Sequence, residues 1–360
     1  MASIRHTRVL GTTQKQAQRD IKAMFQRMAD ELSSILLRQS DISGKVPLSR
    51  LKTVRTAIAP AIMRYFVGVD GRNAFDDRNR ALSPFANILN RHLAGVTGQV
   101  VLAHTKWLKK NVPSDLYQWI QRGQVPVQEQ FSPNPLAQFE HTHEWLDSRG
   151  YDLSDRIWQV GNETRRKIDL LMTEQIRNGN SAVNIAKKLE QFLLPGRADI
   201  RTKKPYGKDG SFNAMRLARS EITLAHGKAA QVAAGMNPFV DMMRWNLSLS
   251  HPRIDICDDI ADKSPYKVAD CPIPVSASHP HCLCYLTSEV TSSPSSTVGQ
   301  LYDEMNNGET ALVNPSNPTV FLKAVLGDVL FDVFVKELIG NDIDLLDLGL
   351  SIGTSVVLNQ

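Results

Sequence analysis

The histidines and cysteines of this chain gather in one short segment, which constrains the fold more than any other feature of the sequence. All four cysteines and three of the nine histidines lie between residues 251 and 284. A tetrahedral zinc ion needs four thiolate or imidazole ligands at about 2.0–2.3 Å, and binding it supplies folding free energy to a segment with little core. The segment predicts either a metal-stapled module or small buried thiols with surface histidines.

The rest of the sequence is typical of a globular protein of two or three domains that stays in the cytoplasm. Hydrophobic residues make up 42% and charged residues 22% of the 360 residues, which are ordinary shares. No run reaches the roughly 18 apolar residues of a membrane span, since charged residues interrupt the best candidate, Phe321–Ile339. The basic start of the chain has no apolar run behind it, so we expect no secretory signal.

A cytoplasmic chain rarely uses its cysteines in structural disulfides, which favours a metal or free buried thiols. No Cys-x-x-Cys pair is present, and the chain ends the segment with His279-Pro-His-Cys282-Leu-Cys284. Cys282 and Cys284 are two residues apart, so in a strand they would point to one face. The preferred ligands of a structural zinc ion are therefore Cys257, His279, Cys282 and Cys284, with Cys271 and His251 in reserve.

Whether such a metal is structural or catalytic depends on how many protein ligands hold it. Four ligands close the site, whereas three leave a position where water could support hydrolysis. The neighbouring aspartates could then act as bases, although they more simply surround a turn (Asp255, Asp258, Asp259 and Asp262). We find no pair of carboxylates with a histidine base in a recognisable arrangement, so no catalytic residue is predicted.

Apolar residues at three- and four-residue steps predict a mainly α fold with a small α+β module. The predicted helices cover residues 13–39, 48–66, 83–110, 114–122, 155–178, 181–193 and 212–235. Gly179 is expected to end the fifth helix and Ser181 to cap the sixth. Short strands are expected at Phe239–Leu249 and Leu283–Leu286. The apolar stripe of 13–39 needs a partner helix, for which this chain is favoured over self-association with another copy.

Composition divides the chain into four parts. We expect a helical region at 1–125, a central domain at 150–290, a Ser/Thr/Pro linker at 291–298 and an acidic tail at 299–360. The stretch 123–150, with His141 and His143 as surface residues, is expected to connect the first two. The tail is expected to contain an amphipathic helix over Val320–Ile339.

Charge is distributed unevenly along the chain. Residues 299–360 carry nine acidic and two basic side chains, a net of −7, so residues 1–298 must carry +12 for the chain to reach +5. A basic body with an acidic tail indicates a polyanion or an acidic partner, or simply an ordinary solvated surface. One basic loop is a weak candidate for nucleic-acid contact: Arg197, Arg201, Lys203, Lys204 and Lys208.

Residues 155–286 resemble the head-morphogenesis domain of the phage Mu F-like minor head proteins. The resemblance is carried by the helical stretch Ile168–Leu189, by Arg216-Leu-Ala-Arg-Ser-Glu-Ile-Thr-Leu-Ala-His-Gly227, and by Trp245 followed by Asp255-Ile-Cys257 and His279-Pro-His-Cys282-Leu-Cys284. The family usually ends in His-Pro-x-Cys-Arg-Cys, so Leu283 departs from it. The family often has a second cysteine three residues after the first; this chain does not, and Cys271 is a candidate to replace that ligand.

The resemblance implies a low-copy structural component of a tailed-phage head. Such a protein is made in the host cytoplasm and enters the virion, where its expected partners are the portal protein, the major capsid protein and packaged double-stranded DNA. In the matched helix we interpret Glu221 as structural, accepting hydrogen bonds from its surroundings. Two other functions remain open: a metal-dependent nuclease or hydrolase that uses the His/Cys segment, and a non-specific DNA-binding protein with salt-dependent affinity.

Overall fold

The computed structural model describes residues 3–4, 7–69, 71–77, 80–121, 147, 149–194, 210–248, 251, 254–290 and 294–307. The chain divides into two compact units. Unit 1 takes in Met1–Thr13, Arg91–Thr142 and Ser220–Gln360, and unit 2 takes in Gln14–Asn90 and His143–Arg219. The divisions fall inside three long helices, which are α1 (Thr7–Arg38), α3 (Pro84–Asn111) and α7 (Gly210–Gly235).

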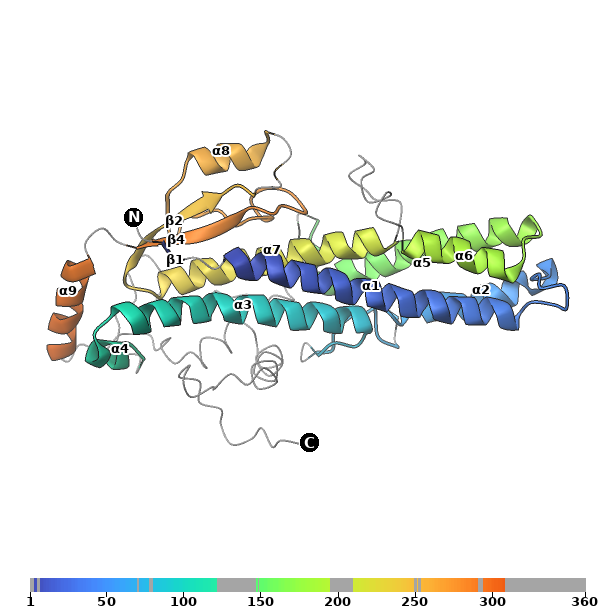
Figure 1. Ribbon diagram of the computed structural model, residues 1–360, viewed down its shortest axis with the longest axis horizontal. Coiled ribbons are helices and arrows are strands. Elements are labelled where there is room, and N and C mark those ends of the chain that lie inside the picture. Colours follow the sequence, from blue (N-terminus) through green and yellow to red (C-terminus); the bar gives the residue numbers. More distant parts are fainter. Residues whose placement is uncertain are drawn as a thin grey trace, which may run out of the picture. The chain divides into compact units, whose positions relative to one another are not determined.

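Unit 2 is helical and is built mainly from α1, α2 (Leu51–Met63), α5 (Leu153–Arg177) and α6 (Ala182–Leu193), labelled in Figure 1. A short 3-10 helix, η1 (Leu48–Arg50), precedes α2. The side chain of Asp152 accepts the Asp155 amide at the start of α5, and that of Ser181 accepts the Asn184 amide at the start of α6. Both caps satisfy amides that the first helical turn leaves without a partner.

The core of unit 2 contains the apolar stripe of α1. Ile21, Phe25 and Leu32 are fully buried within the chain, so the partner helices of this stripe are intramolecular. Phe66 meets Phe25 and Phe85 edge to face, with ring centroids 6.1 and 5.6 Å apart, which is a favourable geometry for aromatic rings. Gly161 of α5 allows the close approach of Phe66, because a Cβ at this position would lie 2.8 Å from Phe66 Cβ.

Unit 1 combines helices with a four-stranded antiparallel sheet. The strands are β1 (Ser3–Ile4), β2 (Val240–Asn246), β3 (Tyr266–Lys267) and β4 (Tyr285–Val290), in the order β1-β4-β2-β3. The central pair aligns Trp245 with Leu286 and Met243 with Ser288. The unit also contains α4 (Ser114–Gln121), α8 (Ile256–Asp262) and α9 (Pro294–Asn306).

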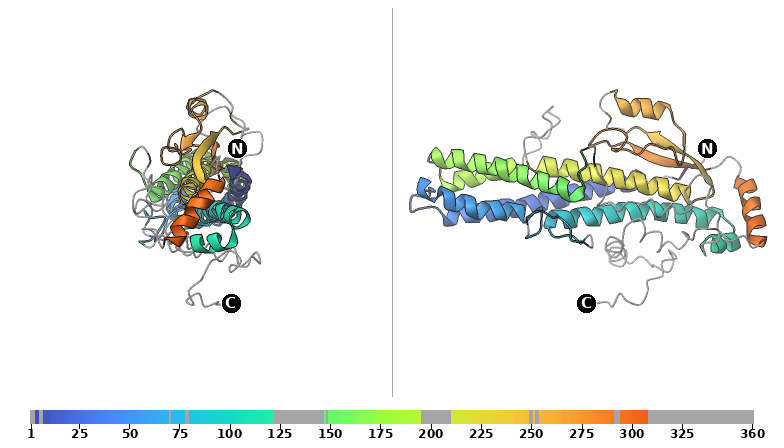
Figure 2. Two further views of the ribbon diagram at one scale, coloured as in Figure 1. Left: turned by 90° about the vertical axis from the view of Figure 1, so that its left-hand side faces the viewer. Right: turned by 180° about the vertical axis from the view of Figure 1, so that it is seen from behind.

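The core of unit 1 lies between the sheet and two helices. Val100 and Leu108 of α3 and Ala229 and Ala233 of α7 share one buried cluster with Trp245. The small alanines let α7 pack close to the strands. In Figures 1 and 2 the strands lie between α7 and α8, so the sheet carries α8 on its other face. This arrangement supports the His/Cys segment described below.

The mainly α fold with a small α+β module is confirmed, as are all seven predicted helices and the two strands, with shifted ends. The segment 48–66 is η1 followed by α2, and the second strand begins at Tyr285, two residues later than predicted. One expectation is wrong in part: residues 294–298 of the predicted linker form the first turn of α9. Pro294 stands at the first helical position, where the fixed φ of proline suits a helix and its missing amide costs nothing.

Several expectations lie outside the described residues. These include residues 291–293 of the linker, His141 and His143 of the connector, and the helix predicted at Val320–Ile339. Among the helices that are described, none is long and apolar enough to cross a lipid bilayer.

We predict that Gly161→Ala lowers the free energy of unfolding by about 2 kcal/mol, because the added methyl group has to displace Phe66. The matched control is Gly11→Ala, another helical glycine, where an added Cβ meets nothing within 4 Å. This control should raise the free energy of unfolding by up to about 1 kcal/mol, since alanine is the better helix former. Denaturant titrations followed by circular dichroism measure both, and equal effects of the two substitutions would contradict the packing described.

Candidate metal centre

The His/Cys segment, between residues 251 and 284, folds around the start of α8 and consists mostly of loops. We call this segment the knuckle. Cys257 is the second residue of α8, and Asp255 caps this helix by accepting the Cys257 amide at 2.8 Å. Asp258 reciprocates by accepting the Asp255 amide at 2.8 Å, which completes a capping box. The cap fixes the first helical turn and with it the direction of the Cys257 side chain.

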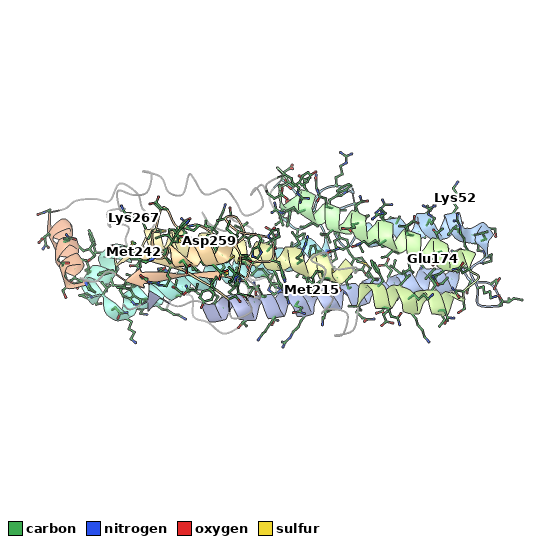
Figure 3. All side chains as sticks on the ribbon, turned by 90° about the horizontal axis from the view of Figure 1, so that it is seen from above. Lys52, Glu174, Met215, Met242, Asp259 and Lys267 are labelled. Atoms are coloured by element: carbon green, nitrogen blue, oxygen red, sulfur yellow. The ribbon has the colours of Figure 1, made fainter. Side chains whose placement is uncertain are left out.

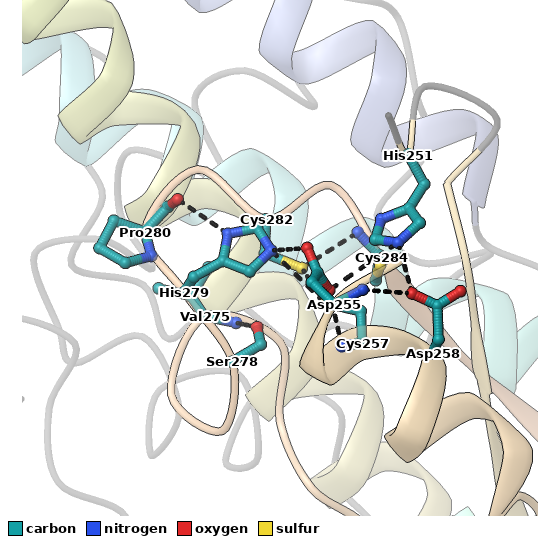
Figure 4. Close-up of polar contacts among 10 residues, drawn as sticks. All are labelled: His251, Asp255, Cys257, Asp258, Val275, Ser278, His279, Pro280, Cys282 and Cys284. Carbon is teal, nitrogen blue, oxygen red and sulfur yellow. Dashed lines mark hydrogen bonds and ion pairs between the residues drawn. The ribbon is translucent and has the colours of Figure 1, made fainter. Parts of the chain in front are cut away.

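Three side chains from different parts of the knuckle converge on one point (Figure 4). The Sγ atoms of Cys257 and Cys282 are 3.7 Å apart, and Cys257 Sγ is 3.5 Å from His279 Nε2. Bonds of about 2.3 Å to sulfur and 2.0 Å to nitrogen at tetrahedral angles give edges of about 3.8 Å between two sulfurs and 3.5 Å between sulfur and nitrogen. The two distances from Cys257 Sγ therefore fit two edges of a zinc-sized tetrahedron, and all three ligand atoms lie within 4.8 Å of one another.

The two ring nitrogens of His279 have different neighbours, and Nε2 is the one that lies near the two thiols. Its Nδ1 lies 3.1 Å from the carbonyl oxygen of Pro280, to which it donates when protonated. That tautomer leaves the Nε2 lone pair for a metal, as in histidine ligands whose other nitrogen bonds a carbonyl group. Asp255 Oδ2 lies 3.3 Å from the same Nε2, so its negative charge also favours a cation here.

Two more candidate ligands adjoin this group. His251 and Cys284 form a second group with Cys257, again with all ligand atoms within 4.8 Å of one another. Cys282 and Cys284 are both buried, whereas Leu283 between them is half-buried, and the three residues directly precede β4. The Cys284 amide also donates to Cys282 Sγ at 3.4 Å. The two groups share Cys257, which makes this residue the centre of the site.

The thiols differ in how readily they ionise. A hydrogen bond from Cys284, which outweighs the effect of burial, lowers the pKa of Cys282 to about 5. Burial raises the pKa of Cys257 to about 12, with a further contribution from the neighbouring Cys282. The hydrogen bond to Cys282 raises the pKa of Cys284 above its ordinary value. Without a cation, one thiolate therefore discourages the ionisation of its neighbours, and a metal ion would relieve that repulsion.

His251 is held by carboxylates. Its Nε2 lies 2.9 Å from Asp258 Oδ2 and 3.8 Å from Asp255 Oδ1. The hydrogen bond with Asp258 raises the pKa of His251, while the Asp255 amide and His251 together lower the pKa of Asp258. These three residues form a third group with metal-ligand spacing. Asp255 and Asp258 also have a structural role, because they form the capping box of α8.

The structure places the four preferred ligands and His251 in two groups that share Cys257, with His279 and Cys282 in one group and His251 and Cys284 in the other. It brings Cys271 to neither. In the described part of the chain, Cys271 belongs to none of the three groups. It is buried in the core of unit 1, with Sγ 3.6 Å from the Pro272 carbonyl oxygen, and burial raises its pKa to about 12. The carbonyl groups of Val268 and Cys271 accept hydrogen bonds from the Gln231 side chain, which holds this loop against α7.

Sequence reasoning missed two contributors to the site. The aspartates at 255 and 258 were interpreted as surrounding a turn, although the Asp-x-x-Asp spacing is itself a capping signal that precedes a helix. The other contributor is Ser220 of α7, whose Oγ accepts the His281 amide at 2.8 Å. His281 has a φ of 68°, which is rare for a residue other than glycine. No local pattern could reveal this contact across 61 positions.

Other predicted site residues lie elsewhere. The basic loop Arg197–Lys208 falls outside the described residues. Asp259 and Asp262 lie on α8 and join none of the groups that the described residues form.

Comparison with known proteins returned no match: no family model, no curated protein and no solved structure corresponds to this chain.

We predict that the reduced protein binds one divalent metal ion per chain and that Cys282→Ala abolishes this binding. The matched control is Cys271→Ala, a second buried cysteine of the same unit, which should retain the metal. Titration with Co²⁺ measures both, since thiolate ligands give a charge-transfer absorption and a tetrahedral ion gives strong visible bands. Loss of binding in the Cys271 variant alone would contradict the ligand assignment.

Proposed function

We propose that the chain is a minor structural protein of a tailed-phage head, acting in capsid assembly near the portal, and that a zinc ion staples its knuckle. The observation that carries the proposal is the bond between Ser220 and the His281 backbone. It joins the helix motif Arg216–Gly227 to the motif His279–Cys284, two of the three features that resemble the Mu F-like family. Their contact supports the interpretation of these motifs as one functional module.

The ligand chemistry favours zinc over hard cations. Thiolate and imidazole ligands select zinc among the common biological divalent ions, whereas magnesium and calcium take oxygen ligands. The proposed ligands are Cys257, His279, Cys282 and Cys284, and His251 is the alternative for the fourth position. Three thiolates and an imidazole would fill all four coordination positions of zinc, as is typical of structural zinc sites.

In this account the chain's own residues position the metal. Asp255 and Asp258 cap α8 and hold Cys257 and His251, Pro280 orients His279, and Ser220 anchors the loop between His279 and Cys282. A zinc ion would cross-link α8 to the loop that leads into β4. Between α8 and β4 only the two residues of β3 lie in a helix or strand, so this cross-link would contribute to the local stability of the segment.

A metal-dependent hydrolase is the second candidate, and one observation favours it. His251, Asp255 and Asp258 lie beside the thiols with metal-ligand spacing, where they could activate a water molecule on an open metal position. The bonds of both carboxylates within the capping box favour the structural role. Nuclease and esterase assays on the metal-loaded protein distinguish the two functions.

Removal of the metal should unfold the knuckle while leaving unit 2 largely folded. We expect a chelator to increase amide hydrogen exchange over residues 254–290 and to leave protection of α2, α5 and α6 unchanged. Adding zinc back should restore the protection. An unchanged exchange pattern after complete metal removal would contradict a structural role for the ion.

The assembly role predicts that the chain purifies with portal-containing heads of the phage that encodes it. Sedimentation of heads followed by detection of the chain measures this association. A chain that lacks residues 308–360, which keeps α9, should lose it if the acidic tail is the docking segment, whereas Cys271→Ala should keep it. A full-length, folded chain that never sediments with heads would contradict the proposed function.

A further inference from the structure

A groove runs between α2 and α5 in unit 2, apart from the metal centre. Its volume is about 650 Å³, and it is lined by η1, by one face of α2 and by three residues of α5 (Arg165, Asp169 and Met172). Ile58, Ile62 and Met172 form an apolar floor and are almost fully buried. At the mouth, Leu48 is 60% exposed, so an apolar side chain is accessible there to a partner.

The polar side chains of the groove are mainly cationic. Arg55 forms a bidentate ion pair with Asp169, with nitrogen–oxygen distances of 2.6 and 2.7 Å, and this pair is neutral. Arg165 donates to the uncharged side chain of Asn162 at 2.8 Å. Lys52 projects from α2 into solvent (Figure 3). Within the described part of the chain neither Lys52 nor Arg165 pairs with a carboxylate, so the groove has a net charge of +2 (three cations against one anion).

We propose that this groove is a docking site for an acidic, leucine-rich amphipathic helix of a partner protein. Apolar side chains at helical spacing would cover Leu48 and the floor, while carboxylates on their flank would face Lys52 and Arg165. Helices recognised in this way bind through apolar anchors spaced three and four residues apart. Charge complementarity then selects an acidic helix over a basic one and speeds association.

The lining distinguishes this partner from a nucleic acid. Phosphate groups need cations and hydrogen-bond donors, but they gain nothing from an apolar floor. Arg55, the central cation, is already neutralised by Asp169. A leucine-rich helix uses both parts of the lining, since its apolar side chains would be buried against the floor while its carboxylates face the cations.

The binding of a synthetic peptide to the full-length protein tests the proposal. Residues 340–352 of this chain, Gly-Asn-Asp-Ile-Asp-Leu-Leu-Asp-Leu-Gly-Leu-Ser-Ile, have the required acidic, leucine-rich composition and serve as the probe. We expect fluorescence anisotropy to detect binding that weakens as salt is added. Lys52→Glu and Arg165→Glu should each raise Kd about fivefold or more, and Leu48→Ser should also raise it.

Two controls make the result specific to the groove. Lys187→Glu reverses an exposed cation of the same unit on α6, outside the groove, and should leave Kd unchanged. A peptide with its three aspartates replaced by asparagine should bind more weakly. Equal binding by all variants, or tighter binding of duplex DNA with the same dependence on Lys52 and Arg165, would overturn the proposal. Binding that appears only after removal of residues 308–360 would assign the groove to the chain's own tail and overturn the partner.

Discussion

The convergence of buried thiols on Cys257 is the constraint on which the functional part of this chain depends. Two sulfur atoms 3.7 Å apart and an imidazole nitrogen at 3.5 Å come from two parts of the sequence, the start of α8 and the motif His279–Cys284. Burying a thiolate among other thiols is costly unless a cation balances it. Cys282, with its pKa lowered to about 5, would carry that charge at neutral pH. A bound metal ion would balance this charge, and the rest of the knuckle fits the role of holding the candidate ligands in place.

The thiols belong to the buried core of unit 1, and helix caps and close approaches hold them in position. The capping box of Asp255 and Asp258 directs Cys257 inward, and Ser220 of α7 holds the turn at His281. Gly227 lets the loop approach α7 closely, because a Cβ there would lie 2.9 Å from Ile273 Cγ2. These contacts connect α7 with the knuckle, so a substitution in the helix motif would affect the metal centre without touching a ligand.

The sequence predicts the helices well because their signal is local: apolar spacing, the cap at Ser181 and the stop at Gly179 each act within a few residues. For the site, the sequence predicts which segment contains the ligands but not which residues meet. The clustering of histidines and cysteines identifies the candidate ligands. It does not show that Cys271 lies apart from them, because the hydrogen bonds from Gln231 to the loop at Val268–Cys271 are tertiary contacts. The pairing of β1 with β4, across more than 280 residues, is likewise beyond any local pattern. By contrast, the sequence analysis does not predict α8, although the spacing of Asp255 and Asp258 is a local signal for the start of a helix.

The central claim is a closed zinc site, and X-ray absorption at the zinc edge of the purified, reduced protein tests it most directly. The account predicts four ligands, with sulfur at about 2.3 Å and nitrogen at about 2.0 Å and no oxygen in the first shell. Cys271→Ala should give the same spectrum, and His279→Ala should lose the nitrogen contribution or replace it with His251. A site with three protein ligands and an oxygen at about 2.0 Å would contradict the structural role and favour the hydrolase. A reduced, folded protein that binds no zinc would contradict the proposed cross-link between α8 and the loop that leads into β4.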